Sequence, residues 1–190
     1  MELKKILVGI EGLKAKGNLD IEVKNIVNNS KSIKEGDMFI AIKGFATDGH
    51  TYINDAIKAG AKVVMVEEGC DLKAIKLPED VTLVMAKDTR EALATCSCNF
   101  YGNPSKNFKL IGVTGTKGKT TTTFMIKEIL EKAGHKVGLI GTIATYINGK
   151  MVSENSRTTP ESLELQKTFA EMAKKGVEYV VMEVSSQSLK

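Results

Sequence analysis

The sequence contains no tryptophan, few other aromatic residues and hardly any arginine. Aromatic residues make up 5% of the 190 positions, and Arg90 and Arg157 are the only arginines among the 27 basic residues. A nucleic-acid-binding surface would need basic side chains gathered on one face, together with aromatic or base-reading residues. The net charge of +4 is instead spread along the chain as lysine, so we expect no nucleic-acid partner.

Cysteine is also scarce, and it occurs at Cys70, Cys96 and Cys98. An odd number of cysteines without an export signal argues against a disulfide framework. The Cys96-x-Cys98 pair lies in a helical stretch and has no second pair of ligands. We therefore interpret these cysteines as structural core residues, with metal binding as the alternative.

Long apolar runs are missing as well. No run approaches the ~20 residues that a membrane-spanning helix needs. The N-terminal apolar stretch, residues 6–10, is shorter than the core of a signal peptide, and Glu11 follows it at once. We expect a cytoplasmic protein without a membrane partner. Its hydrophobic fraction of 42% is enough for one large domain or two small ones.

Residues 1–87 alternate between strand-like and helical patterns. The spacing of apolar residues from Tyr52 to Ala59 predicts a helix, which Gly60 would end. Runs of β-branched and apolar residues predict strands at Glu22–Val27, Met38–Ile42, Val63–Val66 and Val81–Ala86. This alternation favours a small N-terminal α/β domain.

Residues 88–107 are predicted to form a helical connector, which Asp88 or Thr89 can cap. Residues 108–190 then predict helices at Thr120–Ala133 and Glu161–Lys175, and strands at Lys109–Val113, Val137–Ile140, Thr142–Ile147 and Tyr179–Val184. Asn148-Gly149 is a hairpin signal. We expect an α/β fold with a mostly parallel sheet. Since the last strand comes just before the end, we also expect a truncated protein, with residues 108–190 as a partial domain.

A glycine-rich turn joins the predicted strand at Lys109–Val113 to the following helix. Gly115 and Gly118 would let backbone N–H groups turn inward and form an anion nest at the helix N-terminus. Lys119 could then reach the β- and γ-phosphates of ATP, and the Thr120 hydroxyl could bind Mg²⁺. A glycine turn with a chance lysine is the alternative, but the strand-turn-helix context favours phosphate binding. The candidate ATP-binding residues are Thr114, Gly115, Thr116, Lys117, Gly118, Lys119 and Thr120.

Four segments together resemble the Mur ligase family, whose members build the peptide stem of peptidoglycan. The run GVTGTKGKTTTT, residues 112–123, resembles its ATP loop, with Lys117 where most members have Asn. Residues 29–50 resemble its first-domain pattern. Thr-Thr-Pro at residues 158–160 and Glu-Val-Ser-Ser at residues 183–186 resemble the branch that adds the third residue of the stem, although Gln187 replaces a frequent His.

The resemblance implies an ATP-dependent ligase. ATP would phosphorylate the terminal carboxylate of UDP-N-acetylmuramoyl-L-alanyl-D-glutamate, and the amine of a diamino acid would attack the acyl phosphate. Lys119 and Glu183 would be catalytic, and Thr120 and Glu183 would hold Mg²⁺. No site for the diamino acid is recognisable, so we expect the 190-residue chain itself to be inactive. The alternatives are the D-Ala-D-Ala-adding ligase of the family and a nucleotide-binding fragment without catalysis.

The substrate contacts implied by the resemblance are Ser30, His50, Thr158, Thr159 and Ser185, with residues 1–87 as the UDP-binding domain. Each has a structural alternative: Ser30 as a turn residue, and His50 and the two threonines as helix caps. For Glu183 and Ser185 the physical argument adds weight. A buried carboxylate at a strand end needs a partner, and ligands of α/β sheets bind just beyond strand ends.

Overall fold

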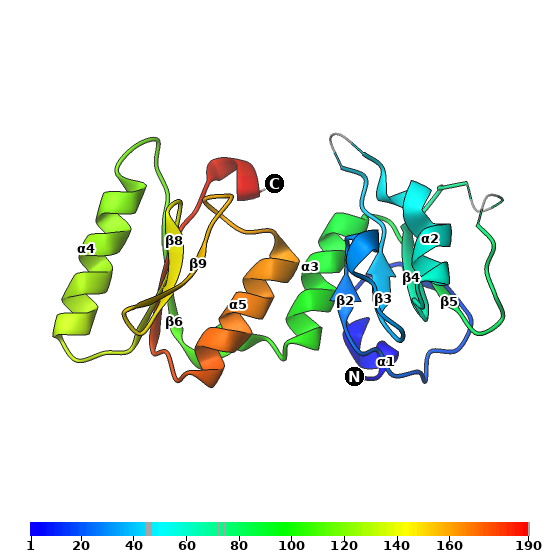
Figure 1. Ribbon diagram of the computed structural model, residues 1–190, viewed down its shortest axis with the longest axis horizontal. Helices are drawn as coiled ribbons and strands as arrows, with labels where there is room; N and C mark the ends of the chain where they lie inside the picture. Colours follow the sequence, from blue (N-terminus) through cyan, green and yellow to red (C-terminus); the bar gives the residue numbers. More distant parts are fainter. Residues whose placement is uncertain (45–46, 72, 74, 190) are drawn as a thin grey trace. The chain divides into compact units, whose positions relative to one another are not determined.

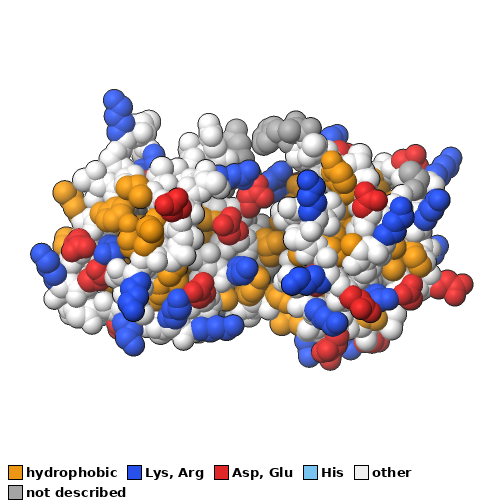
Figure 2. Space-filling view, viewed as in Figure 1, with side chains coloured by type: hydrophobic (Ala, Val, Ile, Leu, Met, Phe, Trp, Pro, Cys, Tyr) orange, Lys and Arg blue, Asp and Glu red, His pale blue; other side chains and the backbone are white. Residues whose placement is uncertain are grey.

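The computed structural model describes residues 1–44, 47–71, 73 and 75–189 (Figure 1). The chain forms two compact units, Met1–Phe100 and Tyr101–Lys190, and each contains one five-stranded sheet. Within the described residues, no helix has both the length and the apolar character needed to span a bilayer. Lysine and arginine side chains are scattered over the visible face and alternate with acidic ones (Figure 2).

The first unit is built on a mainly parallel sheet of order β1-β5-β4-β3-β2. Strands β2 to β5 are parallel, and β1 pairs antiparallel with β5. The strands are β1 (Lys14–Lys16), β2 (Ile26–Val27), β3 (Met38–Ile40), β4 (Val63–Glu67) and β5 (Thr82–Ala86). The helices are α1 (Leu3–Ile6), α2 (Ile53–Lys58) and α3 (Thr89–Phe100), with 3-10 turns η1 (Ser30–Ser32) and η2 (Gly49–Tyr52).

Strands β2, β3 and β5 and helix α2 lie within the segments that the sequence predicts, and β4 extends one residue past its predicted segment, to Glu67. Strand β2 keeps only the end of the predicted run, because Glu22 forms an isolated bridge with Glu2 and Lys24 bonds to Gly36. Strand β1 was not predicted. Its residues are all exposed and show no apolar alternation, so only the pairing with β5 defines it.

Helix α3 begins where the sequence predicts, because the Asp88 carboxylate accepts the backbone N–H groups of Arg90 at 2.7 Å and Glu91 at 3.0 Å. The helix contacts α1, β2 and β4 within the first unit. It buries Cys96 completely, and this burial raises the pKa of the thiol to about 12. The thiol is therefore a core packing group.

The second unit has a sheet of order β6-β10-β7-β8-β9. Strands β6, β10 and β7 are parallel, and β7, β8 and β9 follow one another antiparallel. The strands are β6 (Lys109–Val113), β7 (Val137–Ile140), β8 (Ala144–Ile147), β9 (Lys150–Glu154) and β10 (Tyr179–Glu183). The helices are α4 (Lys119–Lys132) and α5 (Ser162–Lys174), with 3-10 turns η4 (Pro104–Asn107) and η5 (Ser186–Leu189).

The α/β class is confirmed, but the second sheet contains more antiparallel pairing than the sequence predicts. The chain turns at Asn148 and Gly149, with φ of 50° and 77°, and returns as β9. Strand β9 was missed because all of its residues are exposed. Thr142 was placed in a strand, yet it precedes β8, since its backbone N–H donates to Glu183 instead of a strand partner.

Candidate functional site

The candidate site lies at one edge of the second sheet. Strand β10 is placed between β6 and β7, and all three run parallel. The glycine-rich loop after β6 and the turn after β7 therefore flank the end of β10 at Glu183. Strand β9 ends at the same edge, because it is antiparallel to β8, and it delivers residues 155–161. This is the edge at which open α/β sheets bind ligands.

The glycine-rich loop has the backbone conformation that an anion nest requires. Gly118 is left-handed, with φ of 79°, and it directly precedes α4, while Gly115 has φ of 149°. Residues 114–118 are all exposed. The Lys119 ammonium donates to the Gly115 carbonyl at 2.7 Å, which holds a cation against the loop. The loop and the helix N-terminus together have the positive electrostatic character that an anion-binding site requires.

Glu183 is a buried carboxylate, 1% exposed, at the end of β10. Oε2 accepts the Thr120 hydroxyl at 3.0 Å and the Thr142 hydroxyl at 3.1 Å. Oε1 accepts the Thr142 backbone N–H at 2.9 Å. These partners are neutral, and no ion pair of the described residues includes Glu183. A cation beside this carboxylate would offset the cost of its burial.

The residues around Glu183 fit a hard divalent cation. The Thr120 hydroxyl donates its single proton in the hydrogen bond to Glu183, so the lone pairs of its Oγ1 are available to a metal. Carboxylate and hydroxyl oxygens are ligands that Mg²⁺ accepts, and Mg²⁺ bound at a few protein oxygens usually keeps water and phosphate as its other ligands. Thr120 and Glu183 were both predicted from the sequence as metal ligands, and the fold brings them together from α4 and β10.

Gly141 and Asn155 shape the turn after β7, and both were missed from the sequence. A Cβ at Gly141 would lie 2.3 Å from Glu183 Oε1, so only glycine lets the carboxylate approach. The Asn155 amide donates to the Gly141 carbonyl at 2.7 Å, and its oxygen accepts the Thr145 hydroxyl at 3.0 Å. The Gly-Thr pair directly after the apolar run Val137–Ile140 was the sequence signal that could have pointed to this turn.

Thr158, Thr159 and Ser185 lie together beside Glu183. The Thr159 hydroxyl donates to the Glu183 carbonyl at 3.0 Å and accepts the Ser185 backbone N–H at 2.9 Å. Thr159 thus anchors its loop to the end of β10. Thr158 and Thr159 are both partly exposed, but within the described part of the chain the Thr158 hydroxyl has one bond, to the hydroxyl of Thr142 at 3.1 Å, where that of Thr159 has two. Of the two threonines, Thr158 therefore has the hydroxyl that is better placed to meet a ligand.

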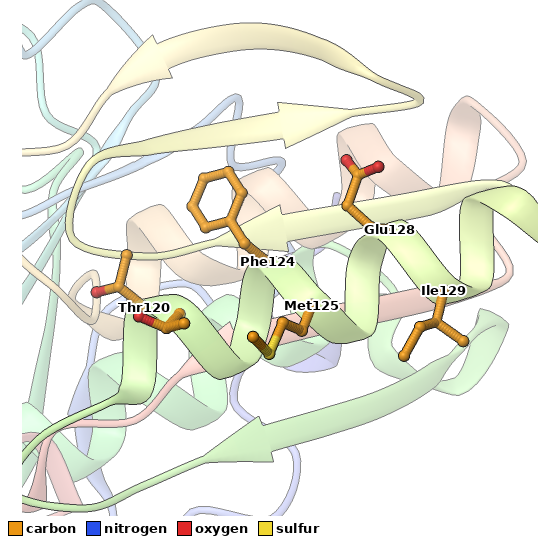
Figure 3. Close-up of a pocket in the computed structure, with 6 residues that line it drawn as sticks. Thr120, Phe124, Met125, Glu128 and Ile129 are labelled. Carbon is orange, nitrogen blue, oxygen red and sulfur yellow. The ribbon is translucent and has the colours of Figure 1, made fainter.

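An apolar hollow of about 510 Å³ runs along α4. In Figure 3, Phe124 and Glu128 lie on one side of this helix, and Met125 and Ile129 lie on the other. Met125 is 60% exposed and Ile129 is 68% exposed. Thr120 is at one end of the hollow, but the remaining lining offers few polar groups that could meet a phosphate. The polar groups of the candidate site gather at the sheet edge instead.

The first unit has its own cavity, of about 440 Å³, at the carboxyl edge of its parallel strands. Asp48 and His50 line it together with Lys43, Glu67 and Cys70. The Glu67 backbone N–H donates to His50 Nε2 at 2.9 Å, and His50 Nδ1 lies 2.6 Å from Asp48. Because Nε2 accepts, Nδ1 carries the ring proton and donates it to Asp48. His50 thus fastens the loop after β3 to the end of β4.

Ser30 begins η1, just after β2, and is partly exposed. Strand β2 is parallel to β3, so Ser30 and the loop that carries His50 follow strand ends at the same edge of the first sheet. Ser30 and His50 belong to the first unit, whereas the candidate phosphate and metal residues belong to the second.

Asp48→Asn is expected to flatten the acid limb of the stability curve. Hydrogen bonds from the His50 backbone N–H and then from its ring hold the pKa of Asp48 below its ordinary value of 3.8. The folded pKa is lowered, so this carboxylate stabilises the fold above pH ~4, and its contribution is lost as the pH falls through the folded pKa. The effect is modest because the side chain is 43% exposed. The urea midpoint of each protein is measured between pH 7 and pH 3. A fall of the same size in both proteins would contradict this prediction.

Comparison with known proteins places both units in one family. Residues 22–101 match the "Mur ligase family, catalytic domain", and residues 113–190 match the "Mur ligase middle domain". The UDP-N-acetylmuramoyl-L-alanyl-D-glutamate–2,6-diaminopimelate ligase of Clostridium botulinum is 53% identical over 189 residues. The match covers 100% of this chain but 38% of that relative.

Solved structures show the same fold. A UDP-N-acetylmuramoyl-L-alanyl-D-glutamate–2,6-diaminopimelate ligase superimposes with a TM-score of 0.73 at 20% identity, covering 100% of this chain and 37% of that one. The MurF ligase of Thermotoga maritima in complex with ADP has a TM-score of 0.56 at 26% identity, covering 86% of this chain and 32% of that one. The chain therefore spans between 32% and 38% of the length of these proteins.

Proposed function

Because the chain belongs to the Mur ligase family, we propose that it carries the nucleotide site and part of the substrate site of a ligase that joins 2,6-diaminopimelate to UDP-N-acetylmuramoyl-L-alanyl-D-glutamate. The observation that carries the proposal is the buried Glu183 carboxylate. It bonds to Thr120, at the phosphate loop, on one side and to Thr142, which contacts Thr158, on the other. The chain thus brings an expected metal ligand beside an expected substrate contact.

The reaction would be the formation of an amide through an acyl phosphate. A carboxylate is a poor electrophile, and transfer of the γ-phosphoryl group of ATP to it creates a good leaving group. The amine of diaminopimelate then attacks the carbonyl carbon, the C–O bond to phosphate breaks, and the amine loses a proton. Both partners of the phosphoryl transfer are anionic, so the main task of the protein is to position them and neutralise their charge.

The chain's own residues divide this task. The backbone N–H groups of residues 115–119 and the Lys119 ammonium would bind and orient the phosphates. Thr158 and Ser185 would orient the dipeptide at the end of β10. Thr120 and Glu183 would hold Mg²⁺, which neutralises charge on the phosphates when it is bound. Lys117 adds a second cation to the loop, and its side chain is exposed.

The first unit would bind the uridine end of the substrate in the cytoplasm. Support for this comes from the 440 Å³ cavity at the carboxyl edge of its sheet and from the resemblance of residues 29–50 to the family pattern. Ser30 would contact the ligand. Both ring nitrogens of His50 already form hydrogen bonds, to Asp48 and to Glu67, so His50 would contribute to binding by shaping the loop.

The direct test is a chimera. Residues 1–190 are joined to the part of the Clostridium botulinum relative that follows the matched region. With ATP, Mg²⁺, the UDP-linked dipeptide and diaminopimelate, the chimera is expected to form the tripeptide, detected by mass spectrometry, whereas the unfused chain forms none. A folded chimera that makes no tripeptide, while the relative is active under the same conditions, would reject the proposed function.

Glu183→Gln is expected to remove the effect of Mg²⁺ on nucleotide binding. The change keeps the shape of the side chain but removes the charge that would hold the cation. Affinity for ADP in Mg²⁺ should fall at least about tenfold, or ~1.4 kcal/mol, while affinity in EDTA stays unchanged. Titration calorimetry of the 190-residue chain measures both values. An unaltered response to Mg²⁺ would show that Glu183 holds no metal.

A further inference from the structure

The Thr142 hydroxyl lies between Glu183, the candidate metal ligand, and Thr158, the candidate substrate contact. Its Oγ1 is 3.1 Å from Glu183 Oε2 and 3.1 Å from Thr158 Oγ1. The backbone N–H of the same residue also donates to Glu183 Oε1 at 2.9 Å. No motif in the sequence pointed to Thr142, yet among the described residues its hydroxyl is the group that bonds to both the buried Glu183 carboxylate and the partly exposed Thr158.

Counting protons gives this chain of groups a direction. A hydroxyl has one proton and two lone pairs, whereas an ionised carboxylate can only accept. Thr142 must therefore donate its proton to Glu183, and it accepts the proton of Thr158. The only hydroxyl proton of Thr158 is then used in the hydrogen bond to Thr142. Its remaining lone pairs can accept a hydrogen bond from a ligand, and the ligand must supply an N–H or O–H group.

The position of Thr142 does not depend on a ligand. The Asn155 amide holds the preceding Gly141 carbonyl at 2.7 Å, and the bond from the Thr142 backbone N–H to Glu183 fixes the turn from the other side. Thr142 is itself exposed, so its hydroxyl fills no space in the core. Removing the hydroxyl should leave the turn in place and change only the bonds to Glu183 and Thr158.

We propose that Thr142 is a positioning residue that makes Thr158 a hydrogen-bond acceptor for a peptide N–H of the UDP-N-acetylmuramoyl dipeptide. The inference rests on the proposed function, because that function supplies the peptide ligand. Thr142 acts through Thr158 and does not touch the ligand. In the same arrangement, the Glu183 carboxylate is held towards Thr120 and the phosphate loop. One hydroxyl thereby links the metal ligand to the recognition of the dipeptide.

The test is a double-mutant cycle on the 190-residue chain. Affinity for UDP-N-acetylmuramoyl-L-alanyl-D-glutamate is measured by calorimetry in EDTA for the unsubstituted chain, T142V, T142S, T158V and T142V/T158V. T142V is expected to weaken binding about five- to tenfold, the effect of one hydrogen bond, and T142S to retain the affinity. The double variant should bind no more weakly than T158V, because Thr142 acts through Thr158. Thermal unfolding checks that each variant is folded.

Ester analogues, in which each peptide N–H of the ligand in turn is replaced by oxygen, test the direction of the bond. One of them should bind the unsubstituted chain about tenfold more weakly than the parent dipeptide and bind T158V as that variant binds the parent dipeptide. Additive losses in the cycle, an unaffected T142V, or full affinity for every ester would overturn the assignment of Thr142. Failure of the unsubstituted chain to bind the dipeptide, in EDTA or in Mg²⁺, would instead reject the proposed function and this inference with it.

Discussion

Lys119→Ala is expected to lower the affinity of the chain for Mg²⁺–ATP about 100-fold. The Lys119 ammonium already lies against the loop, 2.7 Å from the Gly115 carbonyl, so it can turn to a bound phosphate with little movement. A hydrogen bond between charged groups contributes about 1.5–3 kcal/mol, and the upper end corresponds to roughly 100-fold in affinity. The fold should be unaffected, because the ammonium bonds only to an exposed loop. Calorimetric titration of ATP in Mg²⁺ measures the loss.

Lys117→Ala is the matched control for this prediction. Lys117 lies in the same loop and carries the same charge, but it is exposed and precedes the left-handed Gly118 that starts the helix. We expect a loss of severalfold at most, from weaker electrostatic attraction. Lys119→Arg should keep the charge but lose part of the affinity, since the planar guanidinium replaces a compact ammonium. Equal losses for Lys117→Ala and Lys119→Ala would mean that overall charge, and no specific contact, binds the phosphates.

Gly141→Ala is expected both to destabilise the second unit and to abolish the Mg²⁺ dependence of nucleotide binding. The added Cβ would lie 2.3 Å from Oε1 and 3.1 Å from Cδ of Glu183. The carboxylate cannot yield easily, because it is buried and accepts three hydrogen bonds. Overpacking and the broken bonds should together cost about 2–4 kcal/mol of the free energy of unfolding. Urea denaturation measures this cost.

Gly112→Ala serves as the matched control, because its Cβ would come no closer than 3.2 Å, to a methyl group of Val184. It should destabilise the chain much less and leave the response to Mg²⁺ intact. In the double variant Gly141→Ala/Glu183→Asp, the shorter acid withdraws from the new methyl group. The double variant should therefore lose less free energy of unfolding than the sum of the losses in the two single variants. Strict additivity would show that contact with Glu183 is not the reason for glycine at position 141.

The conformation of the glycine-rich loop was predictable from the sequence because it is set by neighbouring residues. Residues 109–119 contain a strand, two glycines, a lysine and the start of a helix, and the nest, the cation and the helix dipole all follow from their spacing. The cap of α3 at Asp88 and the hairpin at Asn148-Gly149 were predictable for the same reason. Each depends on the conformation of two or three neighbouring residues, and the structure has both.

The sequence by itself therefore determined the α/β class, the main strands and helices, the conformation of the glycine-rich loop and, through its motifs, the family. Tertiary structure alone decided which residues surround Glu183. Strand β10 enters between β6 and β7, although it comes last along the chain, and so brings Glu183 within hydrogen-bonding distance of Thr120 and Thr142, which are 63 and 41 positions away. Edge strands β1 and β9 likewise exist because a neighbour pairs with them. Local periodicity carries no information about such pairings, because strand order is set by the packing of the whole sheet.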